Sequence, residues 1–347
     1  MYPPVTLSSR RQVQAAGSLV GLITLGLVGY LVGFTEIAET LRTLTPGQVG
    51  LLLGLGLLPL CVWGLALWLA LATLDSPTTR GQAVLLFCVS LFFNSVTPFG
   101  QTGGTPLSGA VIAHAVQTPY ERALAAIGSL GALNTLATLC LWLPAGVYLA
   151  AGGGLAGARE ATAAAGLGLV GAGAAVLAGW RSRDWLADRL SGALTSLLAA
   201  VGRVFPSWSP PEPAAVTARV DGFVAAVERL ATSRRRLTAL AALAVAGQLG
   251  VMLVLYIALA FLWEPSLPVV LFVVPVSRAA AAVPTPGGIG STEALLTGLL
   301  VTVAGATPAV AGAVGGAFPA GAVLGSGLPR GGGGGGVLSV VRRGGKR

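Results

Sequence analysis

Two stretches of the chain combine glycine and proline with polar side chains inside long apolar segments, at residues 94–106 and 283–293. Breaks of this kind expose backbone N–H groups and helix N-termini, which favour an anionic group such as a lipid phosphate. The alternative is that the glycines only allow helices to pack closely. The candidate binding residues are Asn94, Thr97, Pro98, Gln101, Gly103 and Gly104 in the first stretch, Pro286, Gly287, Gly288 and Glu293 in the second, and Arg278 before it.

Arg278 and Glu293 are charged residues in an otherwise apolar region, where a charge is costly and is a functional candidate by default. In one interpretation, Arg278 meets a lipid phosphate and Glu293 meets an amine or carries a proton. In the other, the two side chains form an ion pair that fixes an antiparallel hairpin. Both interpretations stay open. A third charged position, Glu121 with Arg122, opens the apolar segment after the first break and is interpreted as an interfacial cap rather than a site.

Most enzymatic chemistry is excluded by arithmetic. The chain has 1 His and 12 acidic residues, and it contains neither a metal-binding signature nor a phosphate-binding P-loop. Sets of His and carboxylate side chains carry most hydrolytic and transfer reactions. We therefore expect a protein that is not an enzyme and that needs no metal or cofactor.

The elements that hold these residues must lie in a membrane. Of the 347 residues, 54% are hydrophobic and only 10% are charged, and the mean hydropathy is +0.82. A soluble domain carries about 25% charged residues. The net charge of +9 is assigned to basic loops that meet anionic lipid and hold the orientation, and not to nucleic-acid binding. The composition predicts an all-α polytopic membrane protein, built as a helix bundle.

Charge-free intervals of about 20 residues predict the spanning helices. Two intervals, 82–118 and 265–306, are interrupted by proline and glycine, and each is interpreted as a re-entrant pair of half-length helices. Their similar positions divide the bundle into two related halves. The uninterrupted spans are predicted at Ala15 to Phe34, Val49 to Leu74, Ala123 to Ala150, Ala161 to Trp180, Leu237 to Trp263 and near Pro308 to Leu328.

The arginine distribution predicts the orientation. Nine arginines lie in the segment 181–236, which the positive-inside rule places in the cytoplasm together with both termini. Apolar residues recur at helical spacing in this segment and predict two amphipathic helices on the membrane surface or against the bundle. We expect one integral membrane domain over 1–347, comprising a first half at about 12–180, this cytoplasmic segment, a second half at 237–329 and an irregular, Gly-rich C-terminus at 315–347.

Two motifs resemble signature segments of a known family. Residues 97–104 and 284–293 are similar to those of the lysylphosphatidylglycerol synthase transmembrane-region family, also described as flippase-like. The resemblance covers roughly 10–315 and is closest to archaeal, in particular haloarchaeal, members. It implies a polytopic domain of two related halves with re-entrant helices, associated in some members with moving a modified lipid between leaflets. In other members the domain accompanies a glycosyltransferase that acts on polyprenyl-phosphate-linked sugars.

The sequence departs from the family at Thr105, near Gly131 and Ala132, where an acidic residue is also common, and in its C-terminus. We expect the membrane module alone, since neither a soluble aminoacyltransferase nor a glycosyltransferase domain is visible. Thr105 stands where an acidic residue follows the first Gly-Gly in related archaeal sequences. The six glycines at 331–336 do not favour a firm last helix, and we interpret them as a disturbed reading frame or an aberrant terminus.

Three functions follow as hypotheses. The first is a plasma-membrane protein that flips an anionic phospholipid or a polyprenyl-phosphate-linked conjugate between leaflets. The second is a non-transporting membrane partner or anchor for a separately encoded glycosyl- or aminoacyl-transferase, docked through 181–236. The third, a membrane transferase with its own active site, is disfavoured by the near absence of His and of paired carboxylates.

Overall fold

The structure is a computed structural model that describes residues 42–76, 78–97, 101–151, 181–204, 211–279 and 291–315, with short helical pieces between 166 and 179. The described residues contain helices and no strands. This result confirms the expected all-α polytopic membrane protein. The expected span at Ala15 to Phe34, most of the span at Ala161 to Trp180, and residues 316–347 lie outside the described residues.

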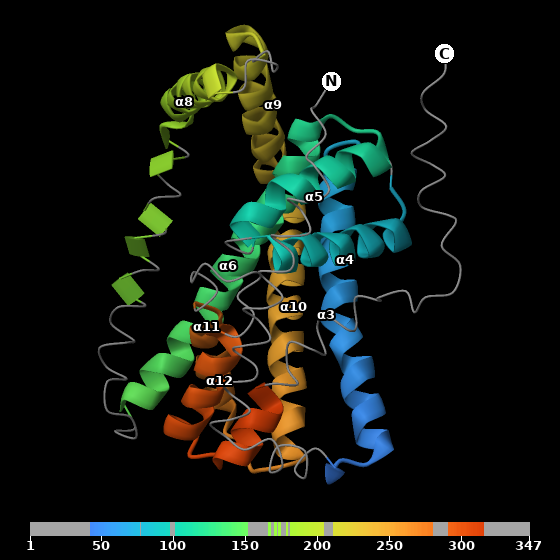
Figure 1. Ribbon diagram of the computed structural model, residues 1–347, viewed down its shortest axis with the longest axis vertical. Coiled ribbons are helices and arrows are strands. Elements are labelled where there is room, and N and C mark those ends of the chain that lie inside the picture. The colour runs from blue at the N-terminus through green and yellow to red at the C-terminus, as the bar shows by residue number, and fades with distance from the viewer. Residues whose placement is uncertain are drawn as a thin grey trace.

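Three helices in the described part are long and apolar enough to cross a membrane: α3 (Pro46–Thr73), α6 (Tyr120–Ala151) and α10 (Arg234–Ala260). Their 28, 32 and 27 residues correspond to about 42, 48 and 40 Å of helix, against a hydrocarbon core of about 30 Å. They coincide with three of the predicted uninterrupted spans. Figure 1 shows α3 and α10 running side by side along the long axis of the molecule.

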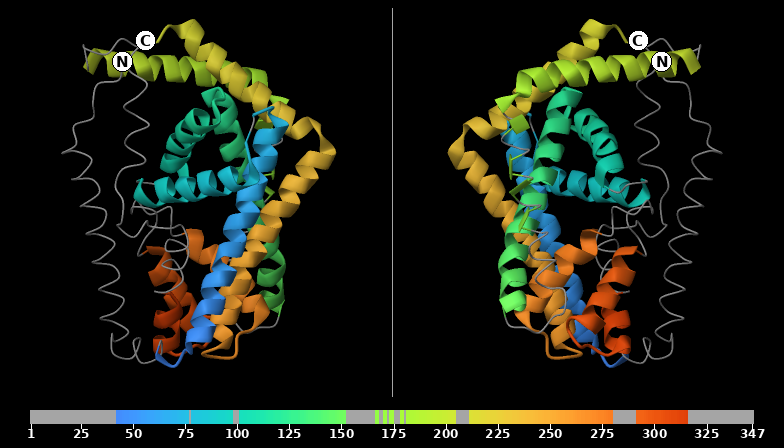
Figure 2. Two further views of the ribbon diagram at one scale, coloured as in Figure 1. Left: turned by 90° about the vertical axis from the view of Figure 1, so that its right-hand side faces the viewer. Right: turned by 90° about the vertical axis from the view of Figure 1, so that its left-hand side faces the viewer.

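The interval 82–118 forms a hairpin of two shorter helices, α4 (Arg80–Val96) and α5 (Gln101–Val116). Its outer ends lie together, because the hydroxyls of Ser76 and Thr118 are hydrogen-bonded at 2.8 Å. The Gln82 amide also donates to the carbonyl of Ala115 at 3.2 Å. The chain therefore enters and leaves the hairpin at the same end of the bundle, between the end of α3 and the start of α6. In Figure 2, α4 lies across the direction of α3 and α10.

The arginine-rich segment contains α8 (Arg183–Val204) and α9 (Pro213–Thr232). Figure 2 shows α8 lying across one end of the bundle, nearly perpendicular to the long helices. Ion pairs bind α9 to the same end of the bundle, from Arg219 to Glu121 at the start of α6 and from Arg229 to Asp75 just after α3. The outer ends of the first hairpin and the basic start of α10 therefore share this end with α8 and α9.

Two further helices, α11 (Leu267–Ala279) and α12 (Ser291–Thr302), lie at the opposite end, followed by a helix over 308–315 (Figure 1). The core accordingly has two parts. One apolar cluster joins α3, α4, α5, α6 and α9 around side chains such as Leu67 and Leu130. The other joins α10, α11 and α12 with the helix at 308–315 around side chains such as Leu255 and Val270. Both clusters include parts of α6 and α10, which connect the two ends.

Candidate functional site

A chain of polar side chains connects three helices where the two apolar clusters meet. At the end of α11, Nη1 of Arg278 donates to Oε1 of Gln248 on α10 at 3.2 Å. The Gln248 amide in turn donates to the backbone carbonyl of Asn134 on α6 at 3.5 Å. The longer of these contacts is at the limit of a hydrogen bond. The contacts fix an arginine against a neutral amide rather than against a carboxylate.

The position of this chain along the helices places it near the middle of the bundle. On α10, Gln248 lies between Leu240 of the first apolar cluster and Met252 of the second. On α6, Asn134 lies between Leu130 and Ala145 in the same way. Both residues are therefore about half-way along helices that are long enough to cross a membrane.

The two ends of the hydrogen-bonded chain differ in exposure. Gln248 is 2% exposed, whereas the Arg278 side chain retains accessible surface. A buried amide with a fixed partner is a rigid anchor, because its rotamer is held by packing. The guanidinium carries five N–H donors. Because one of its nitrogens is bound to Gln248, the others are able to bind an anion without displacing that contact.

Of the two interpretations of Arg278 and Glu293, the ion pair is not seen in the described contacts of Arg278, which donates to Gln248. Glu293 is 2% exposed in the first turn of α12, where a carboxylate suits the helix dipole. The helix at 308–315 covers it, since a Cβ placed on Gly315 would lie 3.4 Å from the Glu293 carbonyl oxygen. The two helices pack against each other, and α11 also packs against α6, while α12 shares an apolar cluster with the helix at 308–315.

In the first break, the structure brings Asn94 and Gly104 together. A Cβ placed on Gly104 would lie 2.2 Å from the Asn94 Oδ1 and 2.7 Å from its Cα. The absence of a side chain at Gly104 therefore allows α4 and α5 to approach closely here. Thr97 ends α4 and donates its hydroxyl and its N–H to the carbonyl of Phe93. Gly103 is half-buried in α5.

Several of the predicted site residues lie wholly or partly outside the described residues. Gln101 begins α5, but its side chain lies outside the described part of the structure. Outside it as well are Pro98, Pro286, Gly287 and Gly288. Among the residues that are described, no hydrogen bond or ion pair joins Asn94 and Thr97 of the first break to Arg278.

Four buried polar atoms have no hydrogen-bond partner in the described part of the chain. They are Nε1 of Trp63 and of Trp142 and Oδ1 of Asn94 and of Asn134. The Trp63 ring lies directly on Gly247, where an added Cβ would be 2.2 Å from Nε1. Unpartnered buried polar groups are rare and call for a specific explanation. Asn134 and Trp63 place an acceptor and a donor beside the buried Gln248 end of the hydrogen-bonded chain, and Arg278 lies at its exposed end.

The sequence interpretation missed Gln248 and Trp63. Gln248 carries the sole side-chain amide in the predicted span Leu237 to Trp263, so an isolated amide in an apolar run was the available signal. Trp63 gives no such signal in the sequence, because what sets it apart is the contact of its ring with Gly247 on another helix. In the described part of the chain, no group of three or more His, Cys, Asp and Glu residues is placed to hold a metal ion.

Comparison with known proteins identifies the family. Residues 14–320 match the family described as the lysylphosphatidylglycerol synthase TM region. A UPF0104 membrane protein of Methanothermobacter thermautotrophicus is 27% identical over 115 residues, covering 33% of this chain and 32% of that relative. The match thus spans about a third of the relative's length. No solved structure matches the chain. The family match extends over most of the chain and includes both broken helices, so the protein belongs to the lysylphosphatidylglycerol synthase transmembrane-region family.

Proposed function

We propose that the protein moves an anionic lipid between the leaflets of the plasma membrane. Arg278 would bind the lipid phosphate as it passes the middle of the bundle. The observation that carries the proposal is the contact of Arg278 with the buried, neutral Gln248 half-way along the bundle. An arginine in this position is costly unless it serves a polar path or a ligand. The substrate class is an anionic phospholipid or a polyprenyl-phosphate-linked conjugate.

The arrangement of the hairpins supports a path that reaches both leaflets. The α4–α5 hairpin belongs to the end of the bundle that carries α9, and α11 and α12 belong to the opposite end (Figure 1). Discontinuous helices from corresponding positions of two halves commonly form the binding site of a transporter near the bilayer midplane. Membership of a family named for a lipid synthase also supports a membrane lipid-related role.

The proposed activity involves binding and movement without covalent chemistry. The lipid phosphate would exchange water for the guanidinium of Arg278, and the acyl chains would remain in contact with the apolar surface of the bundle. Asn94 and Glu293 remain proposed contributors from the two broken elements, as do the glycines and prolines around them. The protein is accordingly proposed to be a lipid carrier and not an enzyme.

The proposal is tested in proteoliposomes that contain fluorescent phosphatidylglycerol, by measuring the fraction of label accessible to external dithionite. Wild-type protein is expected to exchange the label faster than empty vesicles. Arg278→Gln is expected to slow exchange by roughly ten- to a hundredfold, since a charge-assisted hydrogen bond contributes about 1.5–3 kcal/mol.

The matched control is Arg235→Gln, which removes the same charge from an exposed position at the end of the bundle. It should exchange lipid at the wild-type rate. Wild-type exchange no faster than that of empty vesicles, or equal rates for Arg278→Gln and Arg235→Gln, would contradict the proposal.

A second candidate function, that of a membrane anchor for a soluble glycosyl- or aminoacyl-transferase, is favoured by the surface of α8. This helix packs mainly against α9 and leaves Trp185, Leu186, Leu190 and Leu194 exposed. If this face docks a transferase, Leu186→Ser with Leu190→Ser should abolish co-purification of that enzyme and leave lipid exchange unchanged. Co-purification that survives both substitutions would exclude docking through α8.

A further inference from the structure

A cavity of about 420 Å³ lies under α9 at the end of the bundle that carries the arginine-rich segment. Its other walls come from Leu74, which follows α3, and from Pro119, Glu121 and Arg122 at the start of α6. Its volume is within the range of small-molecule binding sites, about 300–1,000 Å³. Neither the hydrogen-bonded chain around Arg278 nor the two broken helices contribute to it.

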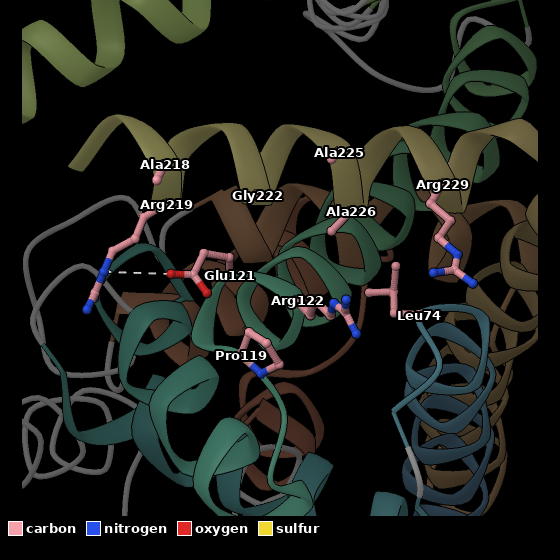
Figure 3. A pocket seen from close by; sticks show the side chains of 10 residues that line it. All are labelled: Leu74, Pro119, Glu121, Arg122, Ala218, Arg219, Gly222, Ala225, Ala226 and Arg229. Atoms are coloured by element: carbon pink, nitrogen blue, oxygen red, sulfur yellow. Dashed lines mark ion pairs between the residues drawn. The ribbon is translucent and has the colours of Figure 1, made fainter. Parts of the chain in front are cut away.

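The cavity exists because one face of α9 carries small side chains. Ala218, Gly222, Ala225 and Ala226 line it, and their spacing of four, three and one residues places them on a single side of the helix. Arg219 and Arg229 also line it, ten residues apart and therefore about 15 Å apart along the axis. Figure 3 shows these two arginines at opposite ends of the hollow, with Arg122 between them.

The charges around the cavity are unequal. Arg219 is 3.7 Å from Glu121, and Arg229 is paired with Asp75. Arg122 is exposed and has no carboxylate partner within the described residues. The three arginines and two carboxylates leave a formal charge of +1 at the cavity. The first N–H groups of α6 add partial positive charge at the same place.

The two ion pairs do not lock the arginines away from a ligand. The Arg219 and Arg229 side chains are 68% and 49% exposed, and solvated ion pairs of this kind contribute little to stability. A phosphate accepts paired hydrogen bonds from a guanidinium and is well matched to arginine. An anion in the cavity would therefore be able to bind Arg122 and to recruit either neighbouring arginine.

We propose that this cavity binds the phosphate group of an anionic ligand. The membrane headgroup region is the favoured source, because Leu74 ends one spanning helix and Pro119 begins the next, so the cavity lies where the hydrocarbon core gives way to headgroups. The site is separate from Arg278 by position and by residues. The proposal for this cavity does not depend on whether the protein moves lipid.

The test is equilibrium binding of dihexanoyl phosphatidylglycerol and of inorganic phosphate to the purified full chain in neutral detergent, with sodium chloride at matched ionic strength as the reference. Wild-type protein is expected to bind phosphatidylglycerol measurably, whereas chloride at the same ionic strength should give no comparable binding signal. Arg122→Gln should weaken binding by about tenfold or more, because it removes the uncompensated charge. Competition by inorganic phosphate would identify a site for any phosphate, whereas binding of the lipid alone would identify a headgroup site.

Two variants separate the cavity from general charge and from folding. Ala225→Leu fills the hollow from an exposed position without changing charge, and should weaken binding to a similar degree. Arg235→Gln removes an exposed arginine that does not line the cavity, and should bind as wild type does. Binding by both Arg122→Gln and Ala225→Leu within twofold of wild type would overturn the proposal. So would wild-type binding that does not exceed the chloride reference.

Discussion

At the scale of single residues, Arg278 shows how a partner changes the meaning of a charge. The charge of an arginine paired with a carboxylate would be neutralised, and the ion pair would hold two helices together. Arg278 is instead held by Gln248, an amide that orients the guanidinium and leaves its charge intact. Glu293, a partner in one of the two interpretations of the sequence, lies buried on α12, where the helix at 308–315 approaches its backbone. The two charges therefore belong to separate environments.

Gln248→Glu tests whether the uncompensated charge of Arg278 matters. It would place a carboxylate where the amide oxygen now lies, 3.2 Å from Nη1 of Arg278. We expect a folded protein with an unchanged or higher thermal midpoint and slower exchange of anionic lipid, because the new carboxylate competes with the lipid phosphate. The measurements are the unfolding midpoint in detergent and dithionite-accessible label in proteoliposomes.

Gln48→Glu is the matched control for that substitution. Gln48 is half-buried at the start of α3 and forms a capping box with Thr45, in which glutamate is an equally good partner. It should leave exchange unchanged. If Gln248→Glu exchanges lipid at the wild-type rate, Arg278 does not need a neutral neighbour for this activity.

At the scale of elements, glycine decides how closely the helices approach. Gly64 of α3 faces Val84 of α4, and an added Cβ would lie 2.5 Å from the Val84 Cα. Gly104 and Gly247 are in similarly close contact with their neighbours. Gly54 of α3 has nothing within 4 Å of the corresponding position. Close packing is therefore seen at these glycines, and the Gly-Gly at 287–288 lies outside the described residues.

Gly64→Ala should destabilise the protein, because backbone atoms of α4 cannot move aside as a flexible side chain would. We expect a loss of about 1–3 kcal/mol, which is typical of overpacking, measured as a lower midpoint of thermal unfolding in detergent. Gly54→Ala is the control in the same helix, and alanine there should be neutral or stabilising by up to about 1 kcal/mol. Equal midpoints for the two variants would show that α3 and α4 are not in tight contact.

At the scale of the whole molecule, the contacts define two ends without assigning either to a side of the membrane. Asp75, Thr118, Glu121 and the start of α10 share the end that carries α9, and Glu264 follows the other end of α10. The arginine count in 181–236 assigns the α9 end to the cytoplasm through the positive-inside rule. We propose this orientation, with both termini cytoplasmic, for a multi-pass protein of the plasma membrane.

Cysteine labelling of intact cells tests the orientation. In a background in which the free cysteines Cys61, Cys88 and Cys140 are replaced by alanine, Glu264→Cys should react with a membrane-impermeant maleimide. Arg235→Cys, at the opposite end of α10, should react only after permeabilisation. Because the two positions are on one helix, each serves as the control for the other. The reverse pattern would place the arginine-lined cavity in the outer leaflet.

The elements of this fold could be predicted from the sequence because hydropathy is a local property. A span must contain about 20 apolar residues whatever it packs against, so α3, α6 and α10 follow from their charge-free intervals. The break between α4 and α5 lies within the predicted stretch 94–106 but is shorter than predicted, because α5 begins at Gln101 and contains Gly103, Gly104 and Pro106. Proline also lies inside α3 and α6, so proline and glycine predict the division of 82–118 without fixing its bounds. Arg278 stood out for the same reason, as a charge in an apolar run.

The partners of these residues were decided by the tertiary structure alone. Arg278 and Gln248 are 30 positions apart, and they meet because α11 returns along α10 and α6. The cavity under α9 requires small residues of one helix to face the start of another, which no periodicity reveals. The sequence by itself determined a membrane protein, its helices and its breaks, because these depend on each segment and the bilayer. Which polar groups meet inside it depends on how the helices pack, and that was visible only in three dimensions.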